Sequence, residues 1–305
     1  MLQKWIKKGG KKDIAMWISF VSMGFNMILA VMKLAAGIMA GSDALISDAV
    51  HSASDVIATL IVIIGIILSS KEADREHPYG HERLECIAAM ILGGIIFMTG
   101  TGIGWEGIQK VAAVTRGREV EIPRTAALVT AITAILVKEW MYRFTAKAAD
   151  MIHSAALRAD AWHNRADGLA SLAAFIGIGG AMLGFPVMDG AACIVISFCV
   201  LKAAWEILRD AVSKTIDQSC DGIMESEMKA LIMEQKGVKG ITGLHTRLFG
   251  SRIYVDAEIQ ADGAISLEKA HEIAETIHLS IEENFPEVKH CMVHMDPYCD
   301  MSLDK

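Results

Sequence analysis

The sequence is poor in features that mark secreted domains and zinc-dependent proteases. Aromatic residues make up 6% of the chain, and only 5 prolines and 6 cysteines occur among its 305 residues. The cysteines form no CxxC pair and no disulfide-framework spacing, so we interpret them as small apolar side chains in a reducing compartment. The chain has no HExxH motif, which argues against a metalloenzyme of the protease type.

An excess of positive charge is also lacking. The formal net charge is -7, and the acidic residues gather in the last third of the chain. A protein that binds nucleic acid needs a basic surface to meet the phosphates. The charge distribution therefore predicts no nucleic-acid partner.

Long apolar segments, by contrast, are abundant. Hydrophobic residues make up 53% of the chain. A bilayer core about 30 Å thick is crossed by about 20 mostly apolar helical residues. Six segments meet this requirement and predict an all-α membrane domain of six transmembrane helices within residues 1–210: 14–39, 44–69, 84–112, 125–142, 155–183 and 187–208.

The basic residues between these segments predict the orientation in the membrane. The predicted helices would place most of the basic segments on one side of the membrane. These segments are an N-terminal arm at residues 4–12 and the loops or tails with Lys71, Arg75, Arg143, Lys147 and Lys214. Positive charge marks the cytoplasmic side of a membrane protein. We therefore predict an integral protein of the cytoplasmic membrane with both termini in the cytoplasm.

The pattern changes near residue 211 to that of a small soluble domain. Amphipathic periodicity alternates there with strand-like alternation. The order helix, strand, strand, helix, strand predicts a cytoplasmic α+β domain of ferredoxin-like architecture over residues 211–305, with one sheet covered by helices. The predicted elements are a helix at 224–235, strands at 241–248 and 252–259, a helix at 267–285 and a strand at 288–295.

One polar motif, D-A-x-H-x-x-x-D, occurs twice inside the apolar segments. The two copies lie at residues 48–55 and 160–167. Charged groups at membrane depth cost a few kcal/mol each, so they call for a functional explanation. A His and an Asp four residues apart stand on one helical face, about 6 Å apart along the axis. The second and fifth helices therefore predict one shared metal site made of His51, Asp55, His163 and Asp167.

Two imidazoles and two carboxylates in a tetrahedron suit Zn²⁺, and also Cd²⁺ and Co²⁺, better than Mg²⁺ or Ca²⁺. Asp48 and Asp160, three residues before each His, fall near the same face, where they would orient the imidazoles or relay protons. The simpler alternative is that these polar residues only hydrogen-bond between helices. Recurrence of the whole motif favours the metal site.

The paired HxxxD motifs in the second and fifth of six helices, followed by a small α+β domain, resemble the cation diffusion facilitator family. The resemblance covers about residues 17–298. It implies a homodimeric exporter, not an enzyme, that exchanges a cytosolic divalent metal for protons by alternating access. It also implies zinc as the ion, because family members with Asn at the position of His51 are associated with manganese.

The resemblance implies two further metal sites and one ion pair. Asp74, His77 and His81 lie in a loop that binds metal in some members. Four residues match positions that bind metal between protomers: Glu258, His271, His294 and Asp296. Glu258 stands where the family has a His. His245 and His290 are close enough in sequence to supply the missing imidazole. Arg83 and Asp210 match an ion pair that marks the dimer contact or a hinge. In each case an ordinary solvated or hydrogen-bonded side chain is the alternative.

Two other functional classes remain as alternatives at this point. A membrane metalloenzyme would need a vacant coordination position, which four protein ligands do not leave. A passive channel would need many weak sites along a pore and not one saturated site. The sequence also leaves open whether Fe²⁺, Mn²⁺, Co²⁺ or Cd²⁺ replaces zinc as the main substrate.

Overall fold

The computed structural model describes residues 11–40, 43–116, 125–182, 185 and 187–298. The chain divides into two compact units between Val212 and Ser213. Most of the predicted basic arm at residues 4–12 lies outside the described residues.

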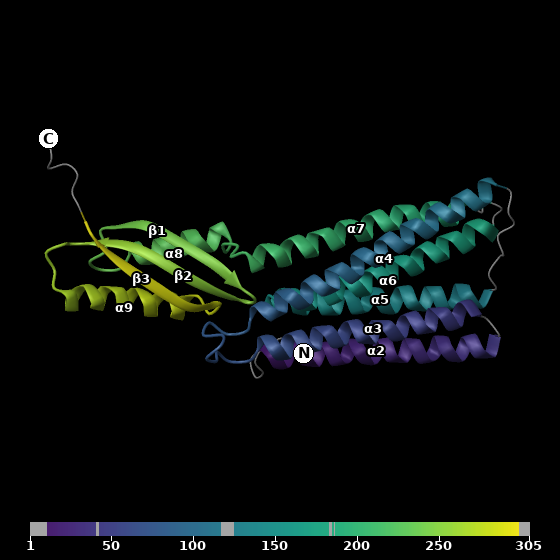
Figure 1. The fold of residues 1–305 in the computed structure, drawn as a ribbon, viewed down its shortest axis with the longest axis horizontal. Coiled ribbons are helices and arrows are strands. Elements are labelled where there is room, and N and C mark those ends of the chain that lie inside the picture. Colours follow the sequence, from purple (N-terminus) through teal and green to yellow (C-terminus); the bar gives the residue numbers. More distant parts are fainter. Residues whose placement is uncertain (1–10, 41–42, 117–124, 183–184, 186, 299–305) are drawn as a thin grey trace. The chain divides into compact units, whose positions relative to one another are not determined.

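The first unit consists of six long helices in its described part (Figure 1). They are α2 (Lys11–Ala40), α3 (Asp43–Ser69), α4 (Arg83–Thr115), α5 (Thr125–Ile152), α6 (Ala155–Met182) and α7 (Val187–Thr215). Within the described residues, three segments are long and apolar enough to cross a membrane: Lys12–Ala35, Arg83–Thr115 and Gly190–Thr215. Helices α3, α5 and α6 carry a group of buried charged residues, which are Asp55, Lys138, Asp160, His163 and Asp167.

Two helices extend further than their apolar segments predicted. Helix α5 continues to Ile152 instead of ending at Tyr142, and α7 continues to Thr215 instead of Leu208. The extra turns of α5 are amphipathic, with Ala148 and Ala149 fully buried. Hydropathy alone detects the membrane-crossing part of a helix and not the turns that continue beyond it.

Glycines of α4 allow it to approach α7 closely. A Cβ at Gly107 would lie 2.8 Å from the carbonyl oxygen of Gly190, and one at Gly104 would lie 2.5 Å from Ser197 Oγ. Ser197 donates a hydrogen bond to the Gly100 carbonyl oxygen at 2.8 Å. The two helices therefore meet along a seam of small residues, as is common in membrane bundles.

Substituting Gly107 with Val should destabilise the helical unit. The new side chain would meet the backbone of α7, and overpacking of this kind costs about 1–3 kcal/mol. We expect a lower unfolding temperature in detergent, measured by fluorescence-detected size exclusion after heating. Gly102→Val is the matched control, because nothing lies within 4 Å of a Cβ there. Equal unfolding temperatures for both variants would contradict the close α4–α7 packing.

The second unit has the predicted order of elements. It comprises α8 (Gly222–Met233), β1 (Gly240–Phe249), β2 (Arg252–Ala261), α9 (Leu267–Asn284) and β3 (Val288–Pro297). The sheet order is β1-β2-β3, with β2 antiparallel to β1 and parallel to β3 (Figure 1). The fold is the expected small α+β unit, and β3 forms one edge of its sheet.

Both helices of this unit pack their apolar faces into one core. Met228 and Ile232 of α8 and Ile277 and Ile281 of α9 are fully buried there. The spacing of four residues places each pair on one helical face. Helix α9 begins at an N-cap, Ser266, whose side chain accepts a hydrogen bond from the Lys269 N–H and satisfies one of the free donors of the first turn.

Candidate functional site

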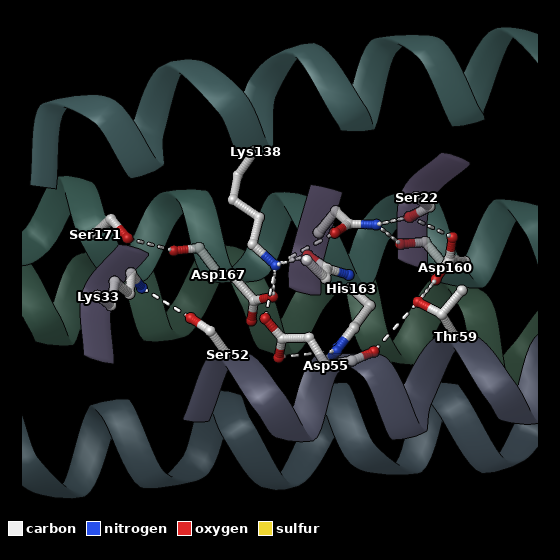
Figure 2. A network of polar contacts seen from close by, with 12 residues as sticks. Ser22, Lys33, Ser52, Asp55, Thr59, Lys138, Asp160, His163, Asp167 and Ser171 are labelled. Atoms are coloured by element: carbon white, nitrogen blue, oxygen red, sulfur yellow. Dashed lines mark hydrogen bonds and ion pairs between the residues drawn. The ribbon is translucent and has the colours of Figure 1, made fainter. Parts of the chain in front are cut away.

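Charged side chains converge in the interior of the helical unit (Figure 2). Asp55 comes from α3, Lys138 from α5, and His163 and Asp167 from α6. Their relative exposures are 2%, 2%, 4% and 6%. Side chains of this kind are almost never fully buried unless they are paired. The cluster is therefore the most unusual feature of the bundle and the first candidate for a functional site.

Three of the four predicted metal ligands lie together. The ligand atoms of Asp55, His163 and Asp167 are within 4.8 Å of one another, and His163 Nε2 lies 3.6 Å from Asp55 Oδ1. Ligand atoms about 2.0–2.1 Å from a tetrahedral Zn²⁺ are about 3.3 Å apart. The observed separation is therefore close to that of a metal-binding arrangement. His51 belongs to α3, but its side chain lies outside the described part of the structure.

Sequence reasoning missed one member of the cluster, Lys138. Its Nζ donates hydrogen bonds to Asp55 Oδ2 at 2.7 Å and to Asp167 Oδ2 at 2.9 Å. It also donates to the amide oxygens of Asn26 at 2.9 Å and Asn164 at 3.3 Å. Figure 2 shows the ammonium between the two carboxylates, with its stem descending from α5. A cation of the protein itself thus lies between two of the predicted ligands.

A signal for Lys138 was present in the sequence. It lies in the apolar segment 125–142, where a lysine is costly enough to need a partner or a function. Lys138 does not belong to any metal-ligand pattern, because an ammonium has three donors and no acceptor and cannot bind a metal ion.

Asp160, predicted to orient an imidazole or relay protons, is fully buried one turn away from the ligands. Its carboxylate accepts hydrogen bonds from Ser22 at 3.5 Å and Thr59 at 3.4 Å. Neither ring nitrogen of His163 has a hydrogen-bond partner among the described residues. The carboxylate oxygen Asp55 Oδ1 lies 3.6 Å from Nε2 of this ring. Asp48 lies in α3, and its side chain is outside the described residues.

The loop between α3 and α4 brings Asp74, His77 and His81 together. His77 Nδ1 lies 3.4 Å from Asp74 Oδ1, and His81 Nε2 lies 3.5 Å from Asp74 Oδ2. The Lys71 side chain and the backbone N–H of His77 donate hydrogen bonds to Asp74 and hold its pKa well below the usual range. The carboxylate is thus ionised and available as a ligand at neutral pH.

The four predicted ligands of the second unit are not assembled within one chain. Glu258 is the register partner of His294 on adjacent strands, and His294 Nε2 lies 3.3 Å from Asp296 Oδ1. His271 belongs to α9. Among the described residues, no three of these four side chains bring their ligand atoms within 4.8 Å of one another. The metal site between protomers stays a prediction, and it would also need ligands from a partner chain.

The predicted dimer or hinge pair lies at helix ends. Arg83 is the first residue of α4, and Asp210 is near the end of α7. The structure thus locates both residues near the terminus of a long helix, and their role stays a prediction.

The comparisons with known proteins assign the chain to a family. Residues 19–214 match the model of the cation efflux transmembrane domain, and residues 220–298 match that of the cation efflux protein, cytoplasmic domain. The matched ranges correspond to the helical unit and the α+β unit. The chain belongs to the cation diffusion facilitator family, whose members are transporters and not enzymes.

Several curated relatives are similar over most of this chain. Metal tolerance protein C1 of Arabidopsis thaliana is 31% identical over 88% of this chain, which spans 59% of that protein. The manganese efflux system protein MneP of Bacillus subtilis is 29% identical, covering 94% of this chain and 98% of that protein. Magnetosome protein MamB of Magnetospira sp. is 29% identical, covering 94% of this chain and 95% of that protein.

Proposed function

We propose that this protein exports a divalent transition metal ion across the cytoplasmic membrane in exchange for protons, and that zinc is its main substrate. The observation that carries the proposal is the convergence of Asp55, His163 and Asp167 within 4.8 Å inside a bundle of long helices. His51, one turn before Asp55 on α3, would supply the fourth ligand. Two imidazoles with two carboxylates favour Zn²⁺, and Cd²⁺, Co²⁺, Fe²⁺ and Mn²⁺ are the alternative substrates.

Lys138 gives the exchange a physical basis. Without a metal ion, two buried carboxylates need a counter-ion, because leaving one unpaired costs about 3–5 kcal/mol. The Lys138 ammonium, 2.7 Å from Asp55 and 2.9 Å from Asp167, supplies that charge. A metal ion cannot approach the same two oxygens while the ammonium is there. We propose that entry of the dication displaces the Lys138 ammonium from the two carboxylates. The ammonium returns to them when the metal ion is released.

Protons enter the cycle through the ligands. Metal ligands have to be deprotonated, so metal binding and proton release are linked. In the inward-facing state the site would bind the metal and lose protons to the cytosol. In the outward-facing state the His and Asp ligands would be protonated again, and the metal would leave.

The remaining sites fit supporting roles in the same function. We propose that Asp74, His77 and His81 pass ions to the transport site. A regulatory ion would bind between the α+β units of a homodimer, at Glu258, His271, His294 and Asp296. Arg83 and Asp210 would lie near the dimer contact. Six spans leave both termini on the cytoplasmic side, in agreement with the cytoplasmic domain matched at residues 220–298.

A transport assay in liposomes with an imposed pH gradient tests the proposal. We expect zinc flux that depends on the gradient and acidifies the compartment from which zinc is taken. Competing Mn²⁺, Fe²⁺, Co²⁺ and Cd²⁺ then rank the substrates, which matters because one relative is named for manganese efflux. Zinc flux that is unchanged when the gradient is abolished with an ionophore would support a passive channel and refute the antiporter.

A further inference from the structure

The α+β unit contains a further cluster of metal-binding side chains, which includes His290, one of the two histidines considered above as a substitute ligand between protomers. The ligand atoms of His278, Glu282 and His290 lie within 4.8 Å of one another. His278 and Glu282 are four residues apart on α9 and so share one helical face, while His290 comes from the edge strand β3. Neither histidine nor the glutamate belongs to the set Glu258, His271, His294 and Asp296.

The distances within the cluster match tetrahedral coordination. Glu282 Oε1 lies 3.4 Å from His278 Nε2 and 3.5 Å from His290 Nδ1. Ligand atoms about 2.0–2.1 Å from a tetrahedral Zn²⁺ are about 3.3 Å apart. Both distances to the carboxylate oxygen are therefore close to those around a bound ion, and all three atoms lie within 4.8 Å of one another.

The surrounding backbone holds two of the ligands in place. Because β3 is an edge strand, some of its backbone groups face away from β2. The carbonyl oxygen of Cys291 lies 2.7 Å from His278 Nδ1, and its N–H donates to Glu282 Oε1 at 3.2 Å. A hydrogen bond from Nδ1–H to a carbonyl directs the Nε2 lone pair of His278 into the cluster. Metal-bound histidines are usually oriented by a contact of this kind.

The chemistry of the cluster selects the class of ion. The cluster offers two imidazoles and one carboxylate as ligands. The three side chains are 25%, 30% and 47% exposed for His278, Glu282 and His290. Water can therefore complete the coordination. Nitrogen and oxygen ligands in this ratio suit Zn²⁺ and its neighbours better than Ca²⁺ or Mg²⁺.

We propose that His278, Glu282 and His290 form a binding site for a divalent transition metal ion such as Zn²⁺, which joins α9 to the edge strand β3. Edge capping alone explains the contacts of His278 and Glu282 with Cys291. Edge capping does not involve the imidazole of His290, which lies 3.5 Å from the same carboxylate oxygen. The metal site accounts for all three side chains.

The test measures zinc bound to the full chain in detergent, with Zn²⁺ alone as the probe. The background variant carries Asp55→Asn, Lys138→Met, Asp167→Asn and Asp74→Asn, which removes carboxylate ligands from the transport and loop sites without leaving Lys138 unpaired. Zinc binding to the α+β unit is then read independently of transport. Chelator-treated protein is equilibrated with buffered Zn²⁺, and bound zinc is measured by mass spectrometry of the metal.

We expect that adding His290→Gln to this background lowers bound zinc by about one ion per chain. Co²⁺ in place of Zn²⁺ should lose its tetrahedral absorption spectrum in the same variant. Glu282→Gln serves as a second variant, and size exclusion shows that each protein is folded. Glu283→Gln is the matched control for Glu282→Gln, because Glu283 is an exposed carboxylate of the same helix outside the cluster.

Two results would overturn the site. One is unchanged zinc in folded His290→Gln and Glu282→Gln proteins. The other is a loss of zinc with Glu283→Gln as large as that with Glu282→Gln, which would show that the cluster does not hold the ion.

Discussion

Asp167→Asn should reduce zinc flux into reconstituted vesicles at least about 100-fold, because removing one member of a buried charge network costs about 3–5 kcal/mol. The carboxylate is 6% exposed and lies with Asp55 and His163 inside the bundle. Asparagine keeps the shape of the side chain but loses the negative charge that attracts a dication. Initial rates of uptake, measured with a zinc-sensitive dye inside the vesicles, report the change.

Asp150→Asn is the matched control for this substitution. Asp150 lies near the end of α5 and pairs with Arg158, and its side chain is 59% exposed. Surface pairs contribute about 0–1 kcal/mol, so flux should stay close to that of the unmodified protein. If Asp167→Asn transported zinc as fast as this control, the assignment of Asp167 as a metal ligand would be wrong.

Lys138→Met should make the stability of the protein depend on zinc. Without the ammonium, the metal-free site holds two carboxylates without their counter-ion, a change that costs about 3–5 kcal/mol. Zn²⁺ can replace the missing charge, so the variant should bind zinc more tightly than the unmodified protein. We expect a lower unfolding temperature in chelator and a larger rise on addition of zinc, measured by thermal unfolding in detergent.

The same variant should also transport more slowly at saturating zinc, because no tethered cation returns to the carboxylates when the ion leaves. Lys147→Met is the control, since Lys147 is an exposed lysine on the same helix. An equal zinc-dependent rise in unfolding temperature for Lys138→Met and for Lys147→Met would argue against competition between Lys138 and the metal ion.

The glycines of α4 illustrate how far sequence reasoning extends. Their number indicates that the helix approaches something closely, but ordinary packing and a dimer contact both satisfy that pattern. The structure shows Gly104 and Gly107 against α7, whereas Gly102 has open space beside it. Which glycine meets which helix depends on the rotation of each helix about its axis, and local spacing does not contain that information.

By itself, the sequence determined the class of protein, the order of elements in both units and three of the side chains that converge in the bundle. These features follow from local physics: apolar length matches the bilayer, and residues four apart share a helical face. Only the tertiary structure decided that Lys138 lies between Asp55 and Asp167, and that His290 of β3 meets α9. Contacts of this kind join residues far apart in the chain, and packing between elements fixes them.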